Sequence, residues 1–263
     1  MEEIILPEIK TISEDENHGV FVIEPLYPGY GQSLGNPLRR VLLSSLEGAA
    51  ISSIKIEGVS HEFSAIPGVK EDAIEVILNL KQIRLKLFGD EPATMKLAVK
   101  GPKEVRASDI KTPSQVEIKN KDLYIATVND NKHSLIIEMF VEKGRGYVPA
   151  ESKPEKPDIG IIQVDSLFSP VLSVNFHVEN TRVGQRTDFD KLTIDIKTDG
   201  TILPKEALKK AAEILVSQFK LISDMPIKVS GTEKKGKGGS TKAKTEKNEK
   251  KIAKKKRSKK GSA

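Results

Sequence analysis

The sequence predicts an α+β fold, and three observations support this. Apolar residues alternate with polar ones in several short stretches, as in strands that bury one face. Three other stretches repeat apolar residues at helical spacing. Residues 230–263 are rich in Lys, Gly, Ser and Thr, and Ile252 is their one sizeable apolar side chain. Such a segment buries too little surface to offset its ordering entropy, so we expect disorder from about residue 229.

Five alternating stretches predict strands, each with one buried face. Their apolar residues are Val20 and Val22; Ile54 and Ile56; Leu135, Ile137, Met139 and Val141; Val174, Phe176 and Val178; and Leu192, Ile194 and Ile196. Proline and glycine interrupt strand pairing. We therefore expect Pro25 to end the first strand, Gly58 the second and the turn at Asp199-Gly200 the last.

The first helix is predicted from apolar residues that precede Gly48, a suitable helix stop. These residues are Leu34, Leu38, Val41, Leu42 and Leu46. Pro37 lacks an amide hydrogen, so the helix should begin close enough to hold it in the first turn.

Two further helices are predicted downstream. The second starts at about Glu71 and carries Ile74, Ile77, Leu78 and Lys81 on one side. The third starts at Pro204 and places Leu208, Ala211, Ala212, Leu215, Phe219 and Ile222 on one stripe. A strand-rich region with turn signals, from Phe88 to Pro157, lies between the first and third helices. This order suggests one domain inserted into another.

Composition excludes several kinds of chemistry. The chain has no cysteine, which removes disulfides, thiolate nucleophiles and thiolate metal sites, and its four histidines are scattered. We therefore expect no metal and no cofactor. No apolar run approaches the ~20 residues of a membrane helix, and the first residues lack the pattern of a secretion signal. A cytoplasmic, nucleoid-associated location is expected.

No catalytic motif is evident. The glycine-rich stretch at 29–35 lacks the lysine and hydroxyl of a phosphate loop, so a tight, closely packed turn is expected there. The stretch at 143–147 (Lys-Gly-Arg-Gly-Tyr) is weak as an RNA-binding motif, and we read it as a turn or a partner contact. Asp188 and Asp190 are read as solvated or capping groups rather than metal ligands.

Binding is the remaining class of function. The first and third helices carry more apolar residues than one buried face needs, among them Leu43 and Ile214. These extra residues belong either to the core or to an oligomer interface. Arg39 and Arg40 lie beside the apolar face, and arginine suits contacts across an interface.

One run of residues decides the resemblance. The sequence Leu-Gly-Asn-Pro-Leu-Arg-Arg-Val-Leu-Leu-Ser-Ser at 34–45 resembles the signature first helix of the RNA polymerase alpha subunit family. Further similar motifs follow in the same order at 58–64, 68–72, 78–81, 144–150, 164–165, 169–171, 182–183 and 185–188. The resemblance covers nearly all of residues 1–228.

The resemblance implies a function, a fold and a domain organisation. The chain would be a non-catalytic alpha subunit of a DNA-directed RNA polymerase, which is a nucleotidyltransferase complex. Residues 1–47 and 171–229 would form a two-layer helix/sheet dimerisation domain, residues 48–170 an inserted β-rich domain, and residues 230–263 a disordered Lys-rich tail. The homodimer would be the platform on which the beta and beta-prime subunits assemble for transcription.

The resemblance also implies interface residues. Arg40 and Leu43 would engage the beta subunit, and Lys81, Val164 and Arg182 the beta-prime subunit. The first and last helices of two copies would pack across a twofold axis, with Leu38, Leu42, Leu215 and Phe219 in the dimer interface. For Val164, a core strand position is the alternative.

Family members usually continue into a small helical C-terminal domain that touches DNA, and no helical pattern follows Met225 here. Residues 230–263 hold 14 Lys and Arg against 3 Glu, whereas residues 1–229 are net acidic. The tail either binds DNA or RNA phosphates without sequence preference or is solvated with no fixed partner. DNA would otherwise be reached through the holoenzyme.

Two competing functions remain open. The chain would be a basic-tailed nucleic-acid or ribosome-associated protein if its globular part were unrelated to alpha subunits, although a dedicated binder should have a basic folded domain. A small phosphate-handling enzyme built on the 29–35 loop would require that loop to bind nucleotides.

Overall fold

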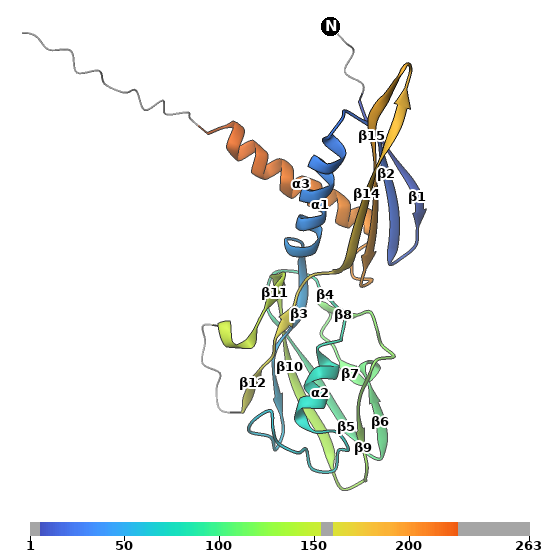
Figure 1. The fold of residues 1–263 in the computed structure, drawn as a ribbon. Helices are drawn as coiled ribbons and strands as arrows, with labels where there is room; N and C mark the ends of the chain where they lie inside the picture. The colour runs from blue at the N-terminus through green and yellow to red at the C-terminus, as the bar shows by residue number, and fades with distance from the viewer. Residues whose placement is uncertain (1–5, 154–159, 226–263) are drawn as a thin grey trace, which may run out of the picture. The chain divides into compact units, whose positions relative to one another are not determined.

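The computed structural model describes residues 6–153 and 160–225. Within them, three α-helices accompany antiparallel sheets, which confirms the α+β class (Figure 1). The expectations for the Lys-rich tail lie outside the described residues.

A four-stranded antiparallel sheet has the order β1-β2-β15-β14. Its strands are β1 (Glu8–Glu14), β2 (His18–Leu26), β14 (Val171–Val183) and β15 (Arg186–Thr198). The register places Phe21 opposite Ile194 and Ile23 opposite Leu192, so these side chains share one face. This face packs against α1 (Tyr30–Ser44) and α3 (Pro204–Ser223) in one hydrophobic cluster.

Helix α1 begins earlier than the sequence predicts, so Pro37 lies in the helix interior. The backbone amide of Gly31 donates to the carboxylate of Asp190 at 2.9 Å, which fixes the first turn to β15. A Cβ at Gly31 would lie 2.6 Å from Val178, and one at Gly35 would lie 2.6 Å from Phe176. The glycine-rich stretch is therefore not a turn: it brings the helix backbone close to the sheet. This packing offsets the cost of an internal proline, about 3 kcal/mol.

Helix α3 begins at Pro204 as predicted, but the predicted stripe is buried only in the first half of the helix. Ala207, Leu208 and Ala211 are buried against the sheet, and Leu215 is half-buried. Phe219 lies farther along the same stripe and is 63% exposed.

The second sheet has seven strands, with the path β7-β5-β10-β3-β4-β8 and β12 paired to β3. The strands are β3 (Glu47–Ile56), β4 (Leu85–Leu87), β5 (Ala93–Lys100), β7 (Ile110–Lys111), β8 (Val116–Ile118), β10 (Ser134–Arg145) and β12 (Ile161–Gln163). Two small pairs are β6 (Lys103–Arg106) with β9 (Tyr124–Val128), and β11 (Tyr147–Val148) with β13 (Ser166–Leu167). Two short 3-10 helices are η1 (Ala107–Asp109) and η2 (Ala150–Ser152).

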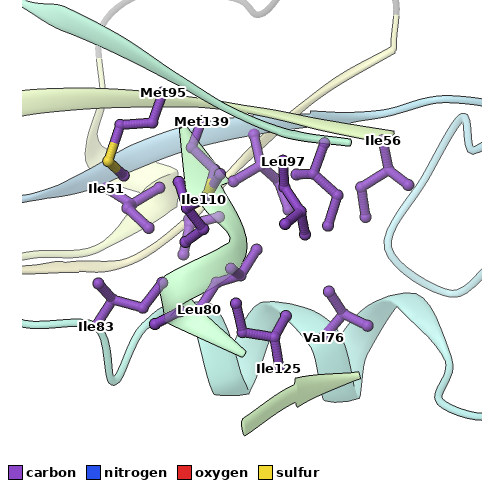
Figure 2. Close-up of a cluster of buried hydrophobic side chains, with 14 of the residues drawn as sticks. Ile51, Ile56, Val76, Leu80, Ile83, Met95, Leu97, Ile110, Ile125 and Met139 are labelled. Atoms are coloured by element: carbon purple, nitrogen blue, oxygen red, sulfur yellow. The ribbon is translucent and has the colours of Figure 1, made fainter. Parts of the chain in front are cut away.

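Helix α2 (Ala73–Leu80) packs on this sheet through a face that the sequence did not predict. Figure 2 shows Val76 and Leu80 pointing from the helix into a cluster with Leu97 and Met139 of the sheet. The predicted stripe is the other side of the helix, where Leu78 is exposed. The side chain of Asp72 accepts from the Glu75 amide at 2.8 Å and caps the helix start.

All five alternating stretches form strands, which confirms those predictions. One boundary was wrong, because β2 continues through Pro25 to Leu26. In the register of β2 with β15, Ile23 is paired with Leu192 and Leu26 with Asp190, and the irregularity between these pairs accommodates the proline.

The two hydrophobic clusters meet at a closely packed crossing. Gly48 of β3 lies directly opposite Gly144 of β10. Phe168 packs on this glycine pair: a Cβ at Gly48 would lie 1.9 Å from the Phe168 carbonyl oxygen, and one at Gly144 would lie 2.7 Å from its ring. Phe168 is 5% exposed. Phe168 thus occupies the space of two missing side chains, with its backbone carbonyl at Gly48 and its ring at Gly144.

We predict that Phe168→Ala destabilises the protein by about 3–5 kcal/mol, because it empties this crossing. Phe63→Ala is the matched control: Phe63 is 75% exposed, and its loss should change the free energy of unfolding by less than about 0.5 kcal/mol. Urea unfolding of both variants measures the difference. Equal effects would show that Phe168 does not stabilise the crossing.

Candidate assembly surfaces

An exposed apolar surface runs along the second half of α3. We call it the α3 surface, and it consists of Val216, Phe219, Leu221 and Ile222. All four side chains are more than half exposed. Tyr30 and Leu34 are exposed apolar residues of α1, which packs against α3. Exposed apolar residues in this number typically mark an interaction site.

The expected dimer residues divide between this surface and the core. Phe219 lies on the α3 surface, and Leu215 is half-buried at its inner end. Leu38 and Leu42 are buried against the sheet of their own protomer, and Leu42 is fully buried. They hold α1 in place rather than face solvent.

The residues expected to contact the beta subunit lie near the end of α1. Arg40 is exposed, and Leu43 is half-buried at the edge of the hydrophobic cluster. They are three residues apart and therefore neighbours on the helix surface. The backbone carbonyl of Arg40 accepts from the Ser44 hydroxyl at 2.7 Å.

A groove of about 590 Å³ lies beside α2, and we call it the α2 groove. One wall is the outward side of α2, with Ile74, Ile77, Leu78 and Lys81. The opposite side includes residues 161–165, among them Val164, and Phe63 stands at the edge. The groove thus brings Lys81 and Val164 together from positions far apart in sequence.

Arg182 does not line this groove. It lies near the end of β14, in the hairpin with β15, and its side chain is exposed. Its Nε donates to the carbonyl of Gly184 at 2.8 Å. The three residues expected to contact beta-prime are therefore split between the two sheets.

Lys81 is held by an ion pair at the end of the α2 groove. Its Nζ lies 2.9 Å from Oδ2 of Asp165. The other oxygen of Asp165 accepts from the Ala150 amide at 2.9 Å, and the Tyr147 hydroxyl also bonds this carboxylate. The Ala150 amide, followed by Lys81, lowers the pKa of Asp165 to about 2.

Val164 is buried, and a second charged side chain holds its backbone. Nζ of Lys153 donates to the carbonyls of Val164 at 2.6 Å and Ser52 at 2.5 Å, and to the hydroxyl of Ser166 at 3.1 Å. Burial lowers the pKa of Lys153. The ammonium ties the segment between β12 and β13, which carries Val164, to β3.

Sequence reasoning missed the roles of Asp165 and Lys153. Asp165 stands inside a matched motif, but spacing cannot reveal that its carboxylate meets Lys81. Lys153 precedes a stretch rich in proline and charged residues, and nothing in the sequence around it predicts a part-buried ammonium. Among residues 6–153 and 160–225, no group of three metal-ligating side chains gathers. In the same part of the chain, no helix is both long and apolar enough to cross a membrane.

Residues 54–169 match the family model described as the RNA polymerase Rpb3/RpoA insert domain. The DNA-directed RNA polymerase subunit alpha of Carboxydothermus hydrogenoformans is 53% identical over 89% of this chain and 74% of its own length. The chain belongs to the RNA polymerase alpha subunit family.

Other alpha subunits agree with this assignment. That of Roseiflexus sp. is 53% identical over 85% of this chain and 69% of its own length. That of Moorella thermoacetica is 53% identical over 88% of this chain and 74% of its own length. Because these matches span the globular part, an unrelated globular domain carrying a basic tail is excluded. Residues 30–35 belong to helix α1 and pack against the sheet, so they do not form the phosphate-binding loop that the competing enzyme function requires.

We predict that Asp165 makes the stability of this alpha subunit depend on acid pH. Its pKa is about 2 in the folded protein against 3.8 ordinarily, so its contribution is present above about pH 4 and lost as pH falls towards 2. Urea midpoints measured from pH 6 to pH 2 should fall less steeply for Asp165→Asn than for the unaltered chain, and the two curves should converge in acid. Parallel curves would contradict this linkage.

Proposed function

We propose that this chain forms the homodimeric platform on which the beta and beta-prime subunits of RNA polymerase assemble, without contributing catalytic residues. The observation that carries the proposal is its 53% identity, over most of its length, to proteins named as polymerase alpha subunits. Two exposed apolar features, the α3 surface and the α2 groove, supply places for large partners.

We propose the domain division 1–47 with 171–229, and 48–170. Two separate clusters of buried residues support it, one drawn from residues 21–46 and 171–211 and the other from residues 51–164. The insert-domain match at 54–169 falls within the second region.

The dimer interface is proposed to be the α3 surface together with α1. Phe219 is its central apolar residue, and Leu215 extends the contact towards the core. Leu38 and Leu42 contribute indirectly to this interface, because they are buried and fix the position of α1. Apolar area of this kind is what an obligate subunit interface typically covers.

We predict that Phe219→Asp weakens the dimer by about 30-fold or more, since loss of a central aromatic anchor costs about 2 kcal/mol. Lys209→Glu is the matched control, because it changes a charge on an exposed position of the same helix. Sedimentation velocity across a concentration series measures the dissociation constant. An unchanged constant for Phe219→Asp would exclude this surface from the interface.

Arg40 and Leu43 are proposed to engage the beta subunit, and Lys81, Val164 and Arg182 the beta-prime subunit. Arg40 and Lys81 have side chains that reach solvent and suit direct contacts. Val164 contributes as part of the lining of the α2 groove, and its own side chain is buried. Arg182 adds a second contact from the β14–β15 hairpin.

The Lys-rich residues 230–263 are proposed to bind nucleic-acid phosphates without sequence preference. Their 14 basic residues against 3 acidic ones support this. Such binding releases counterions and falls steeply with salt. DNA affinity that is insensitive to salt and unchanged on deleting 230–263 would leave the tail as a solvated segment.

The experiment that tests the platform function is a tagged pull-down from native cells with high-salt washes. We expect two very large subunits to copurify, at about one of each per two copies of this chain. Mass spectrometry identifies and counts them. Recovery of ribosomal proteins, or of no large subunit, would contradict the proposal.

A further inference from the structure

Lys81 stands out among the proposed docking residues because an ion pair already holds its side chain in the protomer. A lysine side chain has a flexible four-carbon stem, and an unpaired surface lysine samples many rotamers. Here the ion pair with Asp165 restricts it at 2.9 Å. Both side chains remain partly exposed, at 28% for Lys81 and 35% for Asp165, so a partner can still reach the ammonium.

Both carboxylate oxygens of Asp165 are engaged. Oδ1 accepts from the Ala150 amide, Oδ2 from Lys81, and the Tyr147 hydroxyl makes a third contact. A carboxylate that accepts three hydrogen bonds has little acceptor capacity left for a partner subunit. Lys81 is different: of its three N–H donors, the described residues engage one.

We infer that Asp165 is a positioning residue for the beta-prime docking surface, which holds Lys81 at the end of the α2 groove in the orientation that the partner subunit needs. The inference rests on the proposed function. It assigns Asp165 a role through Lys81 rather than a direct contact with beta-prime.

The contacts of Asp165 join four segments around the groove. Lys81 closes the C-terminal end of α2, Ala150 begins η2, and Tyr147 begins β11. Asp165 itself lies between β12 and β13, next to Val164. One side chain therefore sets the distance between the two walls that carry Lys81 and Val164. Such pre-organisation reduces the ordering cost on binding.

The test is the ratio of beta-prime to beta captured by the full-length tagged chain, co-expressed with both large subunits and washed across a salt series. Asp165→Asn should lower this ratio about threefold to fivefold, as expected for loss of one partly exposed ion pair. Capture of beta serves as the internal reference, since Arg40 and Leu43 lie on α1. Asp165→Glu keeps the charge and should restore part of the ratio.

Asp109→Asn is the matched control. Asp109 also pairs with a lysine, Lys103 at 2.5 Å, and accepts from a backbone amide, that of Arg106 at 3.1 Å. None of these residues lines the α2 groove. Its loss should lower thermal stability to a similar degree and leave the beta-prime to beta ratio unchanged.

A double-mutant cycle separates positioning from general structure. Lys81→Met should lower beta-prime capture, and adding Asp165→Asn to it should cause no further loss, because Asp165 acts through Lys81. Additive losses, or a normal ratio for Asp165→Asn, would overturn the inference while leaving the platform function intact. Failure of the unaltered chain to capture either large subunit would overturn both.

Discussion

The structure depends on the close crossing of two segments between its hydrophobic clusters. The chain leaves the cluster that contains α1 at Gly48 and returns past Phe168. The Phe168 carbonyl lies where the Cβ of any other residue at position 48 would stand, so the two passages cannot separate without exposing a buried aromatic ring.

Helix α2 shows how one short helix serves two surfaces. Val76 and Leu80 face the core, whereas Ile74 and Leu78 face the α2 groove. Both of these faces are apolar, so apolar spacing alone does not mark which of them faces the core. Spacing reports which residues share a face, not what covers that face, so periodicity placed Ile74 and Leu78 on one side without identifying the groove.

The fold class and the strands could be predicted because alternation and turn residues act locally. The start of α1 could not, because its decisive interactions are the Gly31 amide bond to Asp190 and the approach of Gly35 to Phe176, both distant in sequence. The candidate site divides in the same way. The family motifs predicted Lys81 and Val164. The Asp165 carboxylate that holds Lys81 and the Lys153 ammonium that holds the Val164 carbonyl could be identified only from the folded structure.

Helix α3 has 20 residues, and its buried contacts are confined to the first half. As an isolated segment, the second half of α3 would be only marginally stable as a helix in water. Helix formation needs tertiary packing to offset the conformational entropy that it costs. In the proposed dimer, the partner protomer supplies that packing. Order in the second half of α3 then depends on how much of the chain is dimeric. The helicity of this segment and the melting temperature of the protein rise with protein concentration, because folding and assembly are one equilibrium.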